Sequence, residues 1–391
     1  MYIIILWSFF RLLTSIFAAY VSSLRPLTPL ELSFSFLSPS LPLSSWLERV
    51  ALSPWLRWDA VWYQRIVEHG YNPADGTAQF HPLFPWLARL FFATGIHSIL
   101  SLLLVSSISA VGFLYIFHRL AHLEISAENA RFSLLVMLLA PTAFILFAPY
   151  AEALFLLCAA SCFLFARKQR WWLAGMAAGF ATLTRQQGLF LFLPLAYMLW
   201  EMHGRSWDQV RQNWKKFLSL AIIPACYVFW VLYRSIALGD LSIKLGSLQS
   251  LIYSVFISPS AAEVVPQQSF IWPWKAIGLS IQKMARQPDV DIWVNMILGT
   301  IFLILLGVSW KSMKPAYRLY SAIIFLISFS YYTGPIHPYM GLPRHLLLAF
   351  PLFIFISPGL NRAFLRPAYL ILMGSIYIFL IYLYELEAWV A

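Results

Sequence analysis

Charged residues are scarce in this chain. Of its 391 residues only 11% are charged, while 61% are hydrophobic. A soluble protein of this size would need a polar surface that so few charges cannot supply. Apolar runs long enough to cross about 30 Å of hydrocarbon recur along the sequence. The composition therefore argues against a soluble protein and predicts an all-α integral membrane protein with many spans.

Cysteine is nearly absent as well. Cys158, Cys162 and Cys226 lie inside apolar runs, where a thiol usually packs as a small core residue. They predict neither a disulfide framework nor a metal site. No ligand cluster for a divalent metal is visible along the sequence, and we expect no metal and no cofactor. The sequence also lacks G-x-G-x-x-G, a Walker loop, H-E-x-x-H and G-x-S-x-G, so none of these enzyme fingerprints applies.

The net charge of +11 is a signal of topology rather than of nucleic-acid binding. The basic residues lie in short connections between apolar segments, and they gather on one side if the spans alternate. We therefore expect that side to be cytoplasmic. Most acidic residues fall in the opposite connections, which agrees with the same orientation.

A length of about 20 residues per span predicts about eleven spans in one polytopic domain covering residues 1–391. The first is expected to be a retained membrane helix, because it lacks a basic leader. Two long segments, 23–97 and 238–291, then face outward, and their tryptophans favour helices lying in the membrane interface. The expected spans are 2–22, 98–118, 131–148, 151–166, 171–187, 189–201, 217–237, 292–309, 318–334, 343–357 and 367–384.

The stretch RWDAVWYQRIVEHGY, residues 57–71, places Asp59 between Trp58 and Trp62 at the start of a predicted helix that ends at Gly70. Two interpretations are open. Asp59 can simply favour the positive end of the helix dipole on a wet surface. Alternatively, partial desolvation beside Trp58 can tune its carboxylate as a general base.

The motif FHPLFP, residues 80–85, predicts a rigid turn followed by a helix whose start is fixed by proline. His81 can be an interfacial polar tip or a site residue on the same outer surface as Asp59. The spacing alone does not choose between these interpretations.

The run APTAFILFAPYAEALFLL, residues 140–157, places Glu152 close to hydrocarbon at the outer end of a helical hairpin. A carboxylate is costly there unless it is paired, so Glu152 is a structural partner of a basic residue or part of a site. Arg185 in TLTRQQGLF is the natural partner. The small residues Gly175 and Gly179 predict that the helix before Arg185 approaches a neighbour closely.

A late outward turn, GPIHPYMGLPRHLLLAFPLF, carries Arg344 and His345. The arginine can snorkel to the interface, or its guanidinium can bind an anion, because its fork of donors matches phosphate oxygens.

These motifs, in this order, resemble the PIG-V family of mannosyltransferases, which has the GT-C fold. The resemblance covers roughly residues 57–350 and is weakest in 238–291 and at the C-terminus. It implies a multi-span enzyme that moves mannose from a polyprenyl phosphate to a lipid-linked glycan on the lumenal or extracytoplasmic side. Residues matching the family's motifs are Asp59, Tyr150 with Glu152, Arg185 and, less securely, Arg344.

The sequence departs from the family's eukaryotic members between Tyr71 and Pro85, where His81 replaces a common aromatic residue. No asparagine in a predicted connection begins an N-x-Ser/Thr acceptor. Both features favour a prokaryotic relative in a bacterial or archaeal cell membrane, with the endoplasmic reticulum as the location if the chain is eukaryotic. The acceptor then need not be a precursor of a GPI anchor.

A mechanism follows if the donor is a polyprenyl-phosphate sugar. Asp59 would deprotonate the acceptor hydroxyl in an inverting attack, Arg185, Arg344 and His345 would stabilise the leaving phosphate, and Glu152 would orient one of these cations. Membrane lipids and a partner subunit complete the candidate partners. A transporter or flippase, or a non-catalytic subunit handling lipid-linked glycans, is the alternative.

Overall fold

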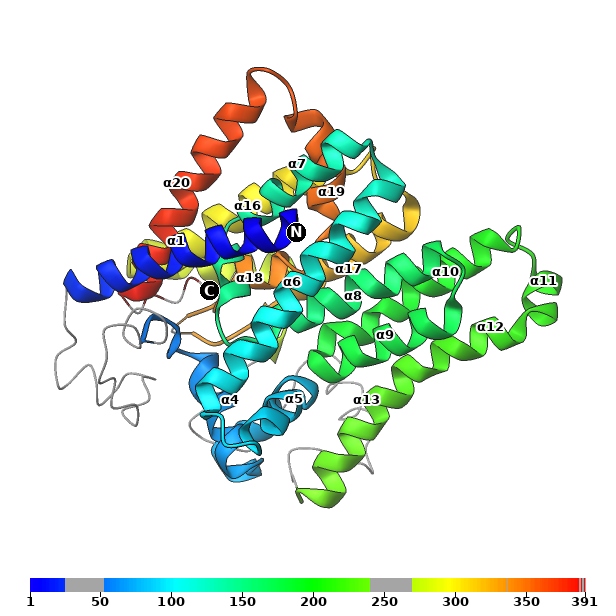
Figure 1. The fold of residues 1–391 in the computed structure, drawn as a ribbon, viewed down its shortest axis with the longest axis horizontal. Helices are drawn as coiled ribbons and strands as arrows, with labels where there is room; N and C mark the ends of the chain where they lie inside the picture. The colour runs from blue at the N-terminus through cyan, green and yellow to red at the C-terminus, as the bar shows by residue number, and fades with distance from the viewer. Residues whose placement is uncertain (25–52, 240–268, 336, 387, 389, 391) are drawn as a thin grey trace.

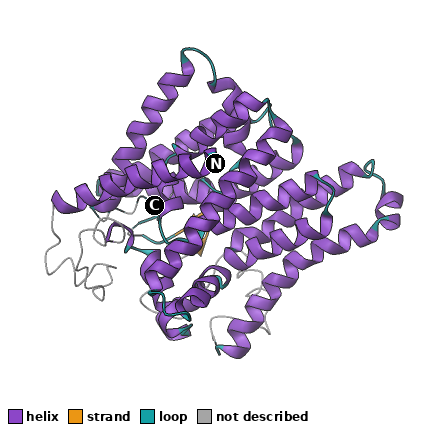
Figure 2. Cartoon of the chain, in the orientation of Figure 1, coloured by secondary structure: helices purple, strands orange, loops and turns teal. Residues whose placement is uncertain are grey.

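The computed structural model describes residues 1–24, 53–239, 269–335, 337–386, 388 and 390 (Figure 1). Parts of the two predicted outer segments, residues 25–52 and 240–268, lie outside the described residues. The described chain is almost entirely helical (Figure 2). Its single described sheet is the antiparallel pair β1 (Ser269–Phe270) and β2 (Tyr331–Tyr332).

The described residues form helices along both halves of the chain. The N-terminal half contains α1 (Tyr2–Leu24), α4 (Asp59–His69), α5 (Leu83–Phe92), α6 (Ser98–Glu124), α7 (Ala127–Leu138), α8 (Glu152–Arg167), α9 (Trp171–Thr184) and α10 (Phe192–Met202). The C-terminal half contains α11 (Trp207–Gln212), α12 (Trp214–Leu218), α13 (Ile222–Leu232), α15 (Pro273–Arg286), α16 (Val290–Ser309), α17 (Pro315–Ser330), α18 (Leu342–Leu346), α19 (Pro351–Leu360) and α20 (Leu365–Glu385). Shorter 3-10 turns are Ser53–Trp55, Pro73–Asp75, Thr77–Gln79, Ala143–Phe147, Gln186–Leu191 and Ser219–Ala221, and Tyr233–Ala237 is a π-helical turn.

Among the described residues, 5 helices are long and apolar enough to cross a membrane: Tyr2–Leu24, Ser98–Glu124, Trp214–Ala237, Val290–Ser309 and Leu365–Glu385. Each of the eleven predicted segments contains helical structure, but several of these helices are shorter than the roughly 20 residues that span the hydrocarbon. A multi-pass membrane protein is therefore supported, and the number eleven stays a prediction.

Helix α9 packs closely against the turn Ser219–Ala221 and against α13, as the small residues in α9 predicted. A Cβ added at Gly175 would lie 2.2 Å from the carbonyl oxygen of Ser219, and one at Gly179 would lie 2.9 Å from the Sγ of Cys226. Larger side chains would push the two helices apart. This close packing fixes the end of α9, where Arg185 is the first residue beyond the helix.

The first and last helices lie side by side, where α1 contacts α20 (Figure 1). The hydroxyls of Thr14 and Tyr377 lie 2.8 Å apart across this contact. Helices α10 to α12 gather at the opposite side (Figure 1). The core between them is built from α6, α8, α17 and α19, where Phe113, Phe163 and Tyr320 pack around Phe350.

A buried carboxylate ties three of these helices together. Glu124, whose side chain is fully buried at the end of α6, forms ion pairs with Arg167 at 2.7 Å and Lys314 at 2.6 Å. The hydroxyl of Tyr317 donates a hydrogen bond to the same carboxylate at 3.0 Å. The cluster therefore joins α6 to the end of α8 and the start of α17.

We expect Glu124→Gln to lower the free energy of unfolding by about 1–3 kcal/mol, because it leaves polar groups without their charged partner. The loss stays below that of breaking a fully buried pair, since Arg167 and Lys314 can turn toward solvent. Thermal unfolding in detergent measures the change. Glu201→Gln is the control, because Glu201 pairs with Arg205 at an exposed i,i+4 site worth at most about 0.5 kcal/mol. Equal destabilisation by the two variants would contradict a special role for Glu124.

Candidate active site

Asp59 is the first residue of α4, as the sequence predicted, and the helix ends before Gly70, whose φ is 82°. The preceding residue, Trp58, is buried and has φ 52° and ψ −119°. A side chain of this size rarely adopts a positive φ, and such a residue costs of order 1–3 kcal/mol. The conformation therefore needs support from the surrounding structure.

That support comes from Arg57, which the sequence analysis did not single out. Its guanidinium donates a hydrogen bond to the carbonyl oxygen of Glu385 at 2.8 Å and forms an ion pair with the carboxylate of the same residue at 3.0 Å. The hydroxyl of Tyr150 donates to the carbonyl oxygen of Arg57 at 3.2 Å and lies 3.0 Å from the hydroxyl of Tyr384. The end of α20 and the turn before α8 thus hold Arg57 in place, two residues before Asp59.

Arg344 connects the two acidic residues that the sequence analysis selected. Its Nη1 lies 2.7 Å from Oδ2 of Asp59, and its Nε lies 3.2 Å from Oε1 of Glu152. Its guanidinium also stands over the ring of Tyr150, 5.4 Å from the centroid. A snorkelling arginine would turn toward solvent, whereas the side chain of Arg344 is only 11% exposed. Arg344 is therefore a buried bridge between two carboxylates.

The pairing of Glu152 with Arg185 is also present, as predicted. Nη1 of Arg185 lies 2.5 Å from Oε1 of Glu152. Asp59, Arg344, Glu152 and Arg185 thus form a row of alternating negative and positive groups, which we call the charge row. Its members come from α4, α18, α8 and the end of α9, so the row assembles only when four distant segments pack together.

The members of the charge row differ in exposure. The side chain of Glu152 is fully buried, whereas that of Asp59 is 22% exposed. Asp59 is therefore the carboxylate that an incoming molecule can reach. Three buried atoms of the row, Oε2 of Glu152, Nε of Arg185 and Nε of Arg344, have no hydrogen-bond partner among the described residues. Buried polar atoms are almost always satisfied in proteins, so these three favour a site that a polar ligand or water completes.

Short helix α18 brings Arg344 into the charge row. Gly341 precedes the helix with φ 65°, a conformation that glycine adopts at no steric cost. The side chain of Asn295 in α16 then accepts a hydrogen bond from the backbone N–H of Leu342 at 2.9 Å. This buried contact fixes the start of α18 relative to α16.

His81 is not an exposed polar tip at the interface, so that interpretation was wrong. The ring is buried, and its Nδ1–H donates to the carbonyl oxygen of Thr182 at 2.7 Å. Burial lowers the pKa of His81 to about 3, so the imidazole is neutral at pH 7. Packing against α9 and the ring of Trp230, which lies 5.9 Å away, takes it from the surface. Its role as a site residue stays a prediction.

His345 follows Arg344 in α18 and is buried as well. Its ring lies 5.6 Å from that of Tyr331. No described hydrogen bond joins it to the charge row, and its proposed contact with phosphate remains a prediction.

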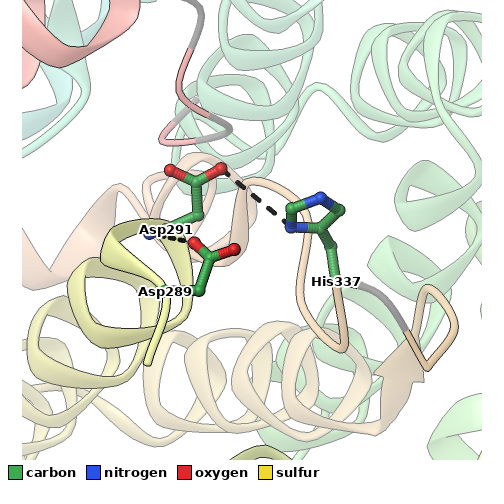
Figure 3. Close-up of side chains that lie close together, drawn as sticks. All are labelled: Asp289, Asp291 and His337. Carbon is green, nitrogen blue, oxygen red and sulfur yellow. Dashed lines mark hydrogen bonds and ion pairs between the residues drawn. The ribbon is translucent and has the colours of Figure 1, made fainter. Parts of the chain in front are cut away.

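The structure also gathers three possible metal ligands that the sequence analysis missed. Asp289 and Asp291 at the start of α16 face His337 from the turn before α18 (Figure 3). One ligand atom from each residue lies within 4.8 Å of the others. The D-x-D spacing is visible in the sequence, but the histidine lies on a distant segment, so no sequence spacing reveals the cluster.

Comparison with known proteins gives two kinds of similarity. Residues 77–232 match the family described as dolichyl-phosphate-mannose-protein mannosyltransferase. GPI mannosyltransferase 2 of Cryptococcus neoformans var. neoformans serotype D, from strains JEC21 and B-3501A, is 27% identical over 260 residues, which is 60% of this chain and 60% of the relative. The chain thus matches less than two thirds of the length of these curated relatives.

Among solved structures, ArnT from Cupriavidus metallidurans bound to undecaprenyl phosphate has a TM-score of 0.51 and 14% sequence identity. The alignment covers 81% of this chain and 57% of ArnT. This likeness concerns the fold alone. In its fold this chain is similar to the GT-C enzyme ArnT, and in its sequence it resembles GPI mannosyltransferase 2.

Proposed function

We propose that this chain is a membrane glycosyltransferase that moves mannose, or a related hexose, from a polyprenyl-phosphate donor to a lipid-linked glycan acceptor. The observation that carries the proposal is the charge row, in which the accessible carboxylate of Asp59 pairs with Arg344 and the buried Glu152 links Arg344 to Arg185. The names of the sequence relatives support mannose as the sugar. The undecaprenyl phosphate bound to ArnT supports a polyprenyl phosphate as the carrier.

A sugar held on a phosphate has a good leaving group, so the reaction needs one base and no second carboxylic acid, unlike most glycosidases. Asp59 is the base in this proposal. It removes the proton from the acceptor hydroxyl as the oxygen attacks the anomeric carbon opposite the phosphate, which inverts the configuration. Glu152 cannot take this role, because its side chain is fully buried between two guanidiniums.

The charge row also supplies positive charge when it is needed. Two carboxylates and two guanidiniums balance while Asp59 is ionised. Transfer of the acceptor proton to Asp59 neutralises one carboxylate and leaves the row with an excess positive charge. The bond to the leaving phosphate breaks in the same step, so Arg344 and Arg185 stabilise the departing anion most strongly in the transition state. Glu152 is a positioning residue that holds both guanidiniums in place.

We further propose that the reaction occurs on the extracytoplasmic or lumenal side, within one polytopic domain. We place the start of helix α15 near the lipid interface, because tryptophan is enriched there. Trp272 and Trp274 at this helix start are 61% and 68% exposed, and their rings stack 4.9 Å apart. The donor's prenyl chain would lie between spans while its phosphate reaches the charge row. The proposed location is a bacterial or archaeal cell membrane, because no asparagine of the sequence begins an N-x-Ser/Thr acceptor. The endoplasmic reticulum is the location if the chain is eukaryotic, and a partner subunit is a candidate partner.

The purified protein in detergent is expected to transfer labelled sugar from polyprenyl-phosphate mannose to lipids extracted from the host. Polyprenyl-phosphate glucose and a nucleotide-linked mannose are run in parallel. Transfer from the polyprenyl carrier alone supports the donor class, and preference for mannose supports the sugar. Absence of product with every polyprenyl-phosphate sugar, in the presence of host membranes that supply any partner, would contradict the proposal and favour a transporter.

A further inference from the structure

We infer that Asp289, Asp291 and His337 form a binding site for a divalent transition-metal ion such as Zn²⁺ or Mn²⁺. The three side chains converge from two segments that are distant in sequence (Figure 3). Nδ1 of His337 lies 4.0 Å from Oδ2 of Asp291, which is too far for a hydrogen bond. The inference concerns a site separate from the charge row and does not rest on the proposed function.

The donor set selects the class of ion. Imidazole nitrogen suits zinc and other transition metals, while carboxylate oxygen also suits magnesium, calcium and manganese. A set of one imidazole and two carboxylates therefore favours Zn²⁺ or Mn²⁺ over the hard ions Mg²⁺ and Ca²⁺, which prefer oxygen ligands alone.

The distances also fit an ion between the three groups. Metal bonds to nitrogen and oxygen are about 2.0–2.2 Å, so ligand atoms around one ion are separated by up to roughly 4.4 Å. The ligand atoms here lie within 4.8 Å of one another, and small side-chain rotations close the difference.

Hydrogen bonds fix both sides of the site. Oδ1 of Asp289 accepts from the backbone N–H of Asp291 at 2.8 Å, which sets the two aspartates at the start of α16. On the other side, Thr333 donates from its hydroxyl to the carbonyl oxygen of His337 at 2.5 Å, and its backbone N–H donates to the carbonyl oxygen of Pro338 at 3.1 Å. Two hydrogen bonds from Thr333 thus fix the backbone of His337 and Pro338. Little reorganisation is needed when an ion binds.

The site connects to the start of α18 through one side chain. Asn295 donates from its amide to the carbonyl oxygen of Asp291 at 2.7 Å and accepts from the backbone N–H of Leu342 at 2.9 Å. An ion bound by Asp291 and His337 would therefore brace both the turn before α18 and the helix start. Arg344 lies two residues further along, so the ion is expected to stabilise the segment that presents this arginine.

The test is metal binding by the full chain in detergent, with any affinity tag removed. Protein is stripped with a chelator, titrated separately with Zn²⁺, Mn²⁺, Mg²⁺ and Ca²⁺, and bound metal is counted by mass spectrometry after desalting. We expect one Zn²⁺ or Mn²⁺ per chain and a higher melting temperature with the ion. His337→Ala and Asp289→Asn should each weaken binding at least about tenfold, and the latter retains the side-chain oxygen that caps α16.

His69→Ala is the matched control, because His69 lies beside the carboxylate of Glu68 at 3.8 Å but belongs to no described three-residue cluster. It should bind metal like the unchanged protein. Unaltered binding in His337→Ala, or binding of Ca²⁺ but neither Zn²⁺ nor Mn²⁺, would overturn the inference. So would a chain that binds less than one ion and keeps the same melting temperature, since His337 and Asp291 would then form only a loose ion pair.

Discussion

Asp59→Asn is expected to reduce sugar transfer by about 10²- to 10⁴-fold, the range that a general base contributes. The amide has the shape of the carboxylate but cannot take a proton from the acceptor hydroxyl. Arg344 keeps its contact with Glu152 in the variant, so the fold should survive. Initial rates of labelled transfer, together with the melting temperature, measure the two effects separately.

Asp75→Asn is the matched control for this variant. Asp75 lies in the same outer segment and pairs with Arg65 at 3.0 Å, but Arg65 is 52% exposed and no described ion pair joins the two residues to the charge row. Such a surface pair contributes about 0–1 kcal/mol and should leave transfer unchanged. Retained transfer in Asp59→Asn would remove Asp59 as the base, and equal losses in both variants would point to a general effect on the outer segment.

Arg344→Lys is expected to lower the rate of transfer by about 10²- to 10³-fold, comparable with the loss of one charge-stabilising donor in other enzymes. A lysine ammonium is a point charge and cannot face Asp59 and Glu152 at once while presenting a further N–H to phosphate. Because the leaving phosphate gains charge in the transition state, kcat should fall more than the donor KM rises.

Arg65→Lys serves as the control for the change of side-chain type, since Arg65 is largely exposed. Steady-state kinetics over a range of donor concentrations separates the two constants. If Arg344→Lys changes only the melting temperature and leaves kcat intact, Arg344 is a structural bridge and not a phosphate ligand. A rise in KM alone would mean that Arg344 holds the donor before reaction but does not stabilise the leaving group.

The pairing of Glu152 with Arg185 shows how far a single sequence can reach. Both residues stand at the end of an apolar helix, and a carboxylate near hydrocarbon requires a cation, so the pair was predictable without coordinates. The close approach of α9 and α13 was predictable for a similar reason, because glycines at Gly175 and Gly179 leave room for a neighbouring backbone. In both cases the neighbouring apolar residues in the sequence already show that the position lies in a membrane helix, so the cost of a charge or the need for a small side chain can be inferred there.

The contact of Arg344 with Asp59 was not predictable in this way. The arginine had two reasonable interpretations, and only the packing of α18 against α16 directs it inward to both carboxylates. The burial of His81 was not predictable either. Its place beside Thr182 depends on how α9 packs, and the FHPLFP motif carries no information about that packing.

By itself, the sequence determined a helical membrane protein, the start of α4 at Asp59 and the residues from which a site could be built. Hydrophobic run length, helix caps and the cost of a charge near lipid are local properties, so they can be read along the chain. The tertiary structure decided which groups meet: the charge row, the burial of His81 and the cluster around His337. Each of these joins segments far apart in sequence, and their meeting depends on the packing of whole helices, which no local pattern specifies.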